Sequence, residues 1–175
     1  VQRPDASPEA KYYHALCLKE LGDGRRAAQE FEELVSAGGP YSTLAAVKAA
    51  DFYLKDRDPE AASSIMEKAS RRLTGTDEAE RQTVLGRISV ALEAYGEARD
   101  QFRAAKQADA AYAPAYLESG LLFITEQNVQ DGVREIRRYL ELAEPSDETA
   151  GIKSFIDQLE RSLQRETPAV EGDMV

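Results

Sequence analysis

The sequence predicts an all-helical solenoid of stacked helix hairpins, and three observations predict it. Small residues occur in pairs twelve positions apart, and these pairs recur every 34 to 36 residues. The signals for helix starts and turns agree with this period. Alanine is frequent, tryptophan is absent and β-branched residues are scattered, so intrinsic propensity favours helix over strand. With 175 residues and 42% hydrophobic content, the chain can bury a sizeable core.

The small-residue pairs predict four places where two helices of a hairpin touch. Antiparallel helices approach closely only where both faces carry small side chains, and large residues then interlock beside the contact. A large apolar residue follows the second member of each pair by four positions, one turn along the same face. The pairs are Ala15 and Ala27, Ala50 and Ala62, Gly86 and Ala98, and Gly120 and Gly132. The large residues are Phe31, Met66, Phe102 and Ile136.

Capping and turn residues place the elements along the chain. Ser7 precedes Pro8 and Asp58 precedes Pro59, so a capping side chain stands before a proline at the first helical position in both cases. Asp77 followed by Glu80 resembles a capping box. Turns inside the hairpins are expected at 22–24, 55–58 and 127–128. Hairpins are therefore predicted at 8–37, 41–73, 77–108 and 113–143.

A single helix at 147–165 is predicted to close the stack, which makes nine helices in all. An open stack needs such a cap, because the last hairpin would otherwise expose its apolar flank to water. Residues 1–7 are expected to form an N-terminal tail and residues 166–175 a disordered C-terminal tail. The apolar stripe of the capping helix consists of Ile152, Phe155, Ile156, Leu159 and Leu163.

The columns resemble the tetratricopeptide repeat (TPR). The likeness is clearest in 15–23 leading to Ala27 and Phe31, and in 139–145, which closes the fourth unit. It covers 8–165 and implies a right-handed α-solenoid. Two departures lie in the middle units: Ser89 replaces a bulky residue, and the connection at 74–76 is short. Half-a-TPR and other helix-pair repeats would give the same columns, so the subtype stays open.

The resemblance also implies a binding site, because the first helix of each TPR hairpin lines a concave groove that takes an extended peptide or a helix. Transferred by register, this groove is expected to be largely apolar, and an exposed apolar strip usually marks a contact surface. Alternatively, the C-terminal helix or a neighbouring subunit fills part of it. The expected groove residues are Tyr12, Leu16, Lys19, Leu44, Val47, Asp51, Leu54, Thr83, Arg87, Leu117, Leu121 and Ile124.

Some TPR proteins grip a terminal carboxylate with a clamp of Lys and Asn in the first two repeats. The sequence does not support such a clamp here. The positions where it would lie hold Tyr12, Leu16, Val47 and Asp51.

Catalytic and metal chemistry is not expected. The only histidine, His14, and the only cysteine, Cys17, are three residues apart, but two ligands do not complete a tetrahedral site. His14 is expected to pack between the helices of its hairpin. Glu30, Glu32 and Glu33 are expected to form a solvated face. We therefore predict no catalytic residue, no metal and no cofactor, and a protein that is not an enzyme.

A second charged cluster lies on the last hairpin. Arg134, Arg137 and Arg138 are close in sequence to Glu135 and Glu141, so salt bridges are expected there.

Charge and hydropathy exclude two classes of partner. The net charge is −10 and the pI near 4.7, so the long-range field repels nucleic acid and anionic membrane surfaces. No run of 18 apolar residues and no signal peptide is present in the sequence, so direct membrane insertion is not expected. Because the chain begins at Val1, we expect that a segment has been removed. Cytoplasm, periplasm and cell envelope all stay open as its location.

These features predict a protein–protein interaction module, an adaptor or scaffold that binds a peptide or helix of a partner. Self-association into a structural scaffold, as a homo-oligomer, is one alternative. An accessory domain of a larger enzyme is another. The Ala- and Arg-rich repeats are typical of bacterial modules, many of which serve envelope assembly, secretion or pilus machinery, and this last point rests on analogy alone.

Overall fold

The computed structural model describes residues 6–69 and 73–166. Within these ranges the chain forms nine α-helices and no strand, as the sequence predicts. The helices are α1 (Pro8–Glu20), α2 (Gly24–Ala37), α3 (Ser42–Lys55), α4 (Pro59–Glu67), α5 (Gly75–Ala91), α6 (Tyr95–Ala108), α7 (Ala113–Thr125), α8 (Val129–Leu142) and α9 (Asp147–Glu166).

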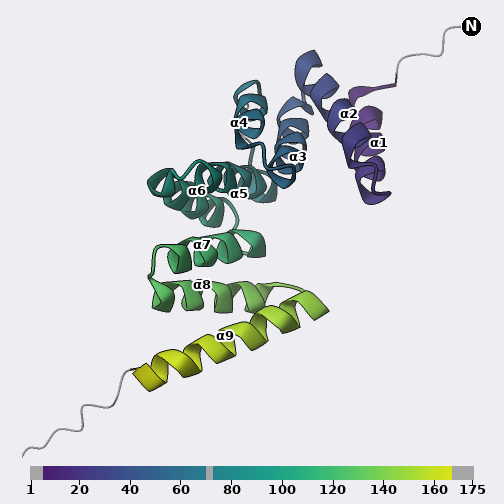
Figure 1. The fold of residues 1–175 in the computed structure, drawn as a ribbon. Helices are drawn as coiled ribbons and strands as arrows, with labels where there is room; N and C mark the ends of the chain where they lie inside the picture. Colours follow the sequence, from purple (N-terminus) through teal and green to yellow (C-terminus); the bar gives the residue numbers. More distant parts are fainter. Residues whose placement is uncertain (1–5, 70–72, 167–175) are drawn as a thin grey trace, which may run out of the picture.

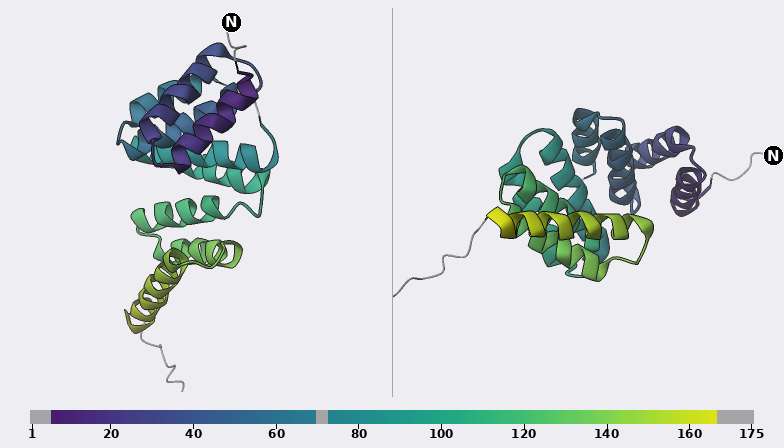
Figure 2. Two further views of the ribbon diagram at one scale, coloured as in Figure 1. Left: turned by 90° about the vertical axis from the view of Figure 1, so that its right-hand side faces the viewer. Right: turned by 60° about the horizontal axis from the view of Figure 1, so that its bottom comes forward.

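The helices stack as a solenoid, which confirms the predicted fold class (Figure 1). Helices α1 with α2, α3 with α4, α5 with α6, and α7 with α8 form four hairpins, here called units 1 to 4. Successive units pack through α2 on α3 and α6 on α7, and α9 packs on α8. Unit 1 and α9 stand at opposite ends of the stack (Figure 1 and the left view of Figure 2). Since α3 contacts α5 and α5 contacts α7, these three first helices lie side by side.

The small residues of each pair are buried at the helix contacts. Ala15, Ala50, Ala62 and Ala98 have no exposed surface. Gly86 faces the ring of Phe102, and a Cβ placed on this glycine would lie 2.3 Å from a ring carbon. The large residues Phe31, Met66, Phe102 and Ile136 are likewise buried. The pattern in the sequence therefore describes the packing inside each hairpin.

The turn inside every unit has the same backbone geometry. One residue of each turn has a positive φ of 60° to 84°, and the next residue donates its N–H to a carbonyl five positions back, which closes the α-helix in a Schellman motif. The positive-φ residues are Gly22, Arg57, Glu93 and Gln127. The following residues are Asp23, Asp58, Ala94 and Asn128, and each is the N-cap of the second helix.

Several expected boundaries need correction. Helix α5 begins at Gly75, so Asp77 lies within its first turn, and Glu80 pairs with Lys48 instead of closing a capping box. Helix α4 ends at Glu67, earlier than the predicted 73, and residues 70–72 lie outside the described residues. The expected tails fall largely outside the described ranges as well.

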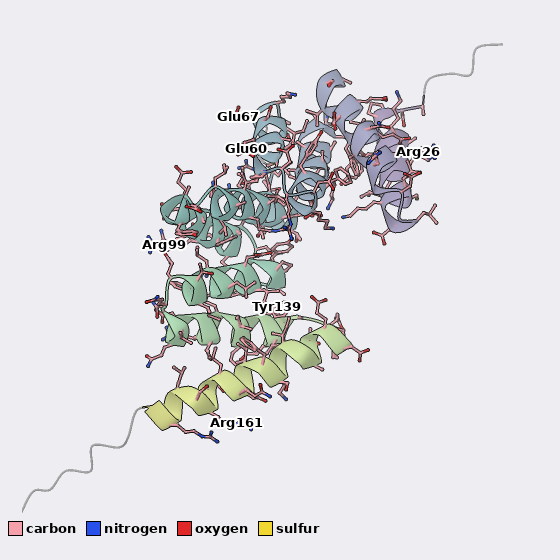
Figure 3. The ribbon with its side chains drawn as sticks, in the orientation of Figure 1. Arg26, Glu60, Glu67, Arg99, Tyr139 and Arg161 are labelled. Carbon is pink, nitrogen blue, oxygen red and sulfur yellow. The ribbon has the colours of Figure 1, made fainter. Side chains whose placement is uncertain are left out.

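Core and surface side chains are divided as the helical pattern requires. One large apolar cluster spans α1 to α5, and three smaller ones follow along α5 to α9. Ser89, which interrupts its column, is buried and donates a hydrogen bond to Gln101 Oε1 at 2.9 Å. Figure 3 shows Arg26, Glu60 and Arg161 on the outside of the stack, whereas Tyr139 is buried.

Candidate functional site

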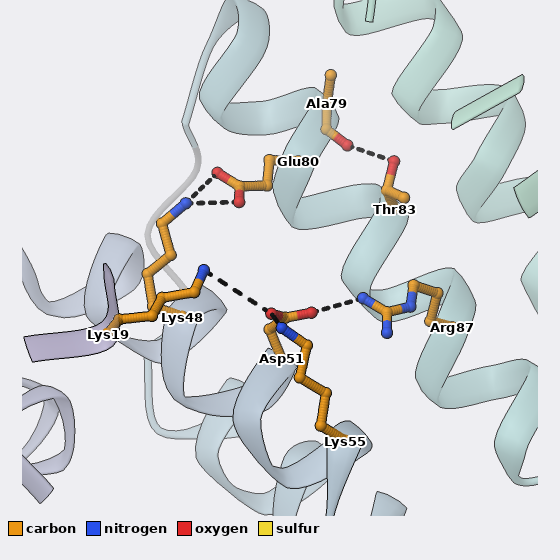
Figure 4. Close-up of polar contacts among 8 residues, drawn as sticks. All are labelled: Lys19, Lys48, Asp51, Lys55, Ala79, Glu80, Thr83 and Arg87. Carbon is orange, nitrogen blue, oxygen red and sulfur yellow. Dashed lines mark hydrogen bonds and ion pairs between the residues drawn. The ribbon is translucent and has the colours of Figure 1, made fainter. Parts of the chain in front are cut away.

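Ion pairs join the first helices of the four units, α1, α3, α5 and α7, and the surface that these pairs cross is here called the odd-helix face. An ion-pair ladder crosses it. Asp51 of α3 accepts a hydrogen bond from Arg87 Nη1 of α5 at 2.6 Å (Figure 4). Arg87 Nε lies 3.3 Å from Glu118 Oε1 of α7, and Lys19 Nζ of α1 lies 3.9 Å from Asp51. The ladder thus links all four units through their first helices.

Asp51 is the centre of this ladder. Its side chain is 18% exposed, and Lys55 Nζ of the same helix lies 3.2 Å away. Burial alone would raise the pKa of Asp51, but the hydrogen bond and charge of Arg87 and the charge of Lys55 hold its pKa below the usual value. The carboxylate is therefore ionised at neutral pH.

A further ion pair, between Lys48 and Glu80, extends the charged surface. Lys48 Nζ of α3 contacts both carboxylate oxygens of Glu80 of α5, at 2.5 and 2.8 Å (Figure 4). Burial raises the pKa of Glu118 and Asp51 adds to the rise, while Arg87 opposes it. The face is consequently rich in paired charges, which corrects the expectation of a largely apolar groove.

The predicted apolar groove residues are mostly engaged in packing. Tyr12, Val47 and Thr83 are buried. Leu16, Leu44 and Leu54 pack against the large core cluster. Leu117 and Ile124 pack against the smaller cluster that unit 4 forms with α9. Leu121, with 47% exposure, is the large apolar side chain of this set that is open to solvent.

A cavity of about 240 Å³ opens at the unit 1 end of the face, between α1, α2 and α3. Its wall is mainly apolar, whereas lysines and one carboxylate stand among its polar lining residues. The lining residues are Lys19, Gly22, Gly24, Ala27, Ala28, Phe31, Lys48, Asp51, Phe52 and Lys55.

Comparison with known proteins supports the fold. No family model matches the chain, and no curated protein sequence matches it. Among solved structures, the crystal structure of MamA has a TM-score of 0.63 at 17% identity and covers 87% of this chain and 86% of that chain. MamA 41-end from Desulfovibrio magneticus RS-1 has a TM-score of 0.59 at 18% identity, and the match covers 78% of this chain and 75% of that chain. The fold is of the TPR type.

A third structure, the MamA RS-1 ArsTM double mutant, has a TM-score of 0.59 at 17% identity and covers 79% of this chain and 76% of that chain. Identities this low concern the fold alone.

The sequence interpretation missed several charged partners of this TPR-type face. Lys48, Lys55, Glu80 and Glu118 were not among the predicted groove residues. The repeat period could have indicated part of this ladder, because Asp51 and Arg87 occupy the same column of successive units, 36 residues apart. Lys55 is also four residues from Asp51, the spacing of a helical ion pair.

His14 differs from its expected role. The side chain is 58% exposed, and its Nδ1 lies 2.7 Å from Glu30 Oε2 on the neighbouring helix. Cys17 is exposed too.

In the part of the chain that the structure describes, no group of three or more His, Cys, Asp or Glu side chains is arranged to hold a metal ion. No helix within the same ranges is long and apolar enough to cross a membrane.

The remaining charged clusters form salt bridges. Arg138 pairs with Glu141 at 2.8 Å, as expected from the sequence. Glu135 pairs with Lys106 of α6 and not with an arginine of its own helix, and this salt bridge joins units 3 and 4. Arg137 reaches Asp157 and Glu160, both at 2.5 Å, and so ties α9 to α8.

Proposed function

We propose that this TPR-type module is a non-enzymatic adaptor that binds an extended or helical segment of a partner protein on its odd-helix face. The observation that carries the proposal is the ladder from Lys19 through Asp51 and Arg87 to Glu118. It places polar groups from four units on one surface. A segment lying across the units would meet all of them at once.

The side chains of this surface combine the two properties that recognition requires. Arg87 and Glu118 keep 30% of their side-chain surface exposed, so they remain accessible to polar groups of a partner. Leu121, three residues along α7 from Glu118, adds exposed apolar area beside the ladder. Apolar contact supplies affinity, whereas placed charges fix register and exclude wrong partners.

An affinity capture from a lysate of the source organism tests the proposal. Leu121→Asp should lose a specific partner that the unmodified protein retains, because a charge would be desolvated in the interface. Phe155→Asp is the matched control, since Phe155 is 55% exposed and lies on α9, which is not among the helices of the face. Leu117 is unsuitable for this test because it is partly buried and packs against the core cluster of unit 4 and α9. Retention of every partner by Leu121→Asp would exclude the proposed face.

Self-association is a second candidate, favoured by exposed apolar side chains at both ends of the stack. Tyr13 and Leu21 are exposed in or beside α1, and Phe155 is exposed on α9. End-to-end contacts through these residues would give open assemblies. Light scattering over a concentration series should then show growth that Phe155→Asp prevents. A monomer at every concentration excludes this candidate.

A role in bacterial envelope, secretion or pilus assembly remains a proposal by analogy with other modules of this type. Identification of the captured partner tests that proposal as well.

A further inference from the structure

We propose that the cavity between α1, α2 and α3 binds one apolar side chain of an acidic partner segment, and that lysines at the cavity bind the carboxylates next to it. The inference rests on the proposed function and names the chemistry of the partner. It concerns unit 1 and the first helix of unit 2, whereas Leu121 tests the opposite end of the face.

The apolar part of the cavity suits a single side chain. Its wall includes Ala27, Ala28 and Phe31 of α2 and Phe52 of α3. Gly24 keeps the wall open beside Phe52, because a Cβ on Gly24 would lie 3.3 Å from that ring. The volume of about 240 Å³ is below the range of roughly 300–1,000 Å³ typical of small-molecule pockets. An aliphatic or aromatic anchor of a peptide is the better fit.

The charges around the cavity favour carboxylates. Three lysines, Lys19, Lys48 and Lys55, line it with one carboxylate, Asp51. Glu80 neutralises Lys48, so Lys19 and Lys55 beside Asp51 leave an excess of one positive charge. The whole chain has a net charge of −10, so this excess runs against the general field. An acidic segment would be repelled by most of the molecule and attracted here, which makes the location specific.

Lys19 and Lys55 are free enough to bind carboxylates of a partner. Lys55 is 64% exposed, and Lys19 is 36% exposed and 3.9 Å from Asp51, beyond ordinary hydrogen-bond distance. Asp51 already accepts the 2.6 Å bond from Arg87. A bound carboxylate can therefore draw Lys19 and Lys55 away from Asp51 without leaving that side chain unpaired.

Fluorescence anisotropy with labelled synthetic peptides tests the inference. The first peptide carries one leucine flanked by glutamates, the second replaces the leucine with glycine, and the third replaces the glutamates with lysines. The first should bind about tenfold more tightly than either of the others, and added salt should weaken its binding. Equal binding of all three, or no binding of the first, overturns the inference.

Two sets of variants locate the binding. Lys19→Gln with Lys55→Gln should weaken the first peptide about tenfold, because two attractive charges are lost without new repulsion at Asp51. The control is Lys68→Gln with Lys153→Gln, which removes two exposed lysines outside the cavity and should leave binding unchanged. Ala28→Leu should fill the cavity and abolish the preference for leucine over glycine. Circular dichroism confirms that each variant is folded.

Failure of the inference is distinguishable from failure of the proposed function. If the peptides do not bind as expected while Leu121→Asp still loses a captured partner, the odd-helix face is a binding site of different chemistry. If Lys19→Gln with Lys55→Gln leaves binding of the acidic peptide unchanged, the cavity is not its site, whatever the lysate shows.

Discussion

Gly120 of α7 and Gly132 of α8 face each other so closely that a Cβ on either would lie 2.9 Å from the other's carbonyl oxygen. The same added atom on Gly120 would lie 2.5 Å from a side-chain carbon of Ile136. Because one of the obstacles is backbone, a rotamer change cannot relieve the contact. Unit 4 is therefore the hairpin in which helix separation depends most directly on the absence of a side chain.

Gly120→Ala should destabilise the protein by about 1–3 kcal/mol or more, because α7 and α8 must move apart. Gly151→Ala is the control. Gly151 lies in α9 with nothing within 4 Å of its added Cβ, and the better helix propensity of alanine should stabilise by about 0.5–1 kcal/mol. Urea denaturation measures both changes. A Gly120→Ala protein as stable as the unmodified one contradicts this account of the contact.

Ala94→Asn should stabilise the protein by about 1 kcal/mol. Ala94 is the N-cap of α6 and has no capping hydrogen bond, although its φ of −83° and ψ of 60° match those of Asp23 and Asn128, which do cap. Asn128→Ala should cause a loss of similar size. Thermal unfolding of both variants checks this prediction, and an unchanged midpoint for Ala94→Asn counts against it.

Glu93→Gly should stabilise by about 1 kcal/mol, since Glu93 has a φ of 60° in the left-handed region. Gly22 occupies the same place in unit 1 with a φ of 84°, so Gly22→Ala is expected to cost about as much. Denaturation midpoints of the two variants should move in opposite directions. Movement of both in the same direction would exclude backbone strain as the cause.

Glu78 should make the protein sensitive to acid. Burial alone would raise its pKa, but hydrogen bonds from Arg81, Gln82 and the Leu73 N–H lower the pKa to about 2 from 4.5. Because the folded-state pKa is below the unfolded value, the stabilisation is present above pH 4.5 and is lost as pH falls towards 2. Its source is charge-assisted hydrogen bonding, a contribution on the order of 1–3 kcal/mol.

Glu78→Gln should lower the free energy of unfolding at neutral pH and flatten its decline in acid. Chemical denaturation at a series of pH values measures both effects. The same acid slope in the variant and in the unmodified protein would assign the acid sensitivity to other carboxylates.

The fold could be predicted from the sequence because its contacts are local and repeated. Ala15 and Ala27, or Gly120 and Gly132, are only twelve residues apart, so the spacing alone encodes which helix faces meet. Boundaries between units were harder to predict. Asp77 and Glu80 fit a capping box by residue type, yet α5 starts at Gly75 and Glu80 pairs with Lys48 of the preceding unit.

The candidate site was predicted less completely, because its character depends on contacts between units. The register placed Val47 and Tyr12 on the right helices, but both side chains are buried in the core. Helix α3 presents Lys48 and Lys55 at the cavity instead. A hairpin pattern repeats in sequence, whereas the curvature that decides which side chains remain exposed comes from packing of successive units.

Hydrogen–deuterium exchange of the module with and without its captured partner tests the central claim most directly. Binding on the odd-helix face predicts slower exchange in α1, α3, α5 and α7, with α4, α6 and α8 little changed. Protection concentrated in the even-numbered helices, or confined to the two ends of the stack, would contradict the claim.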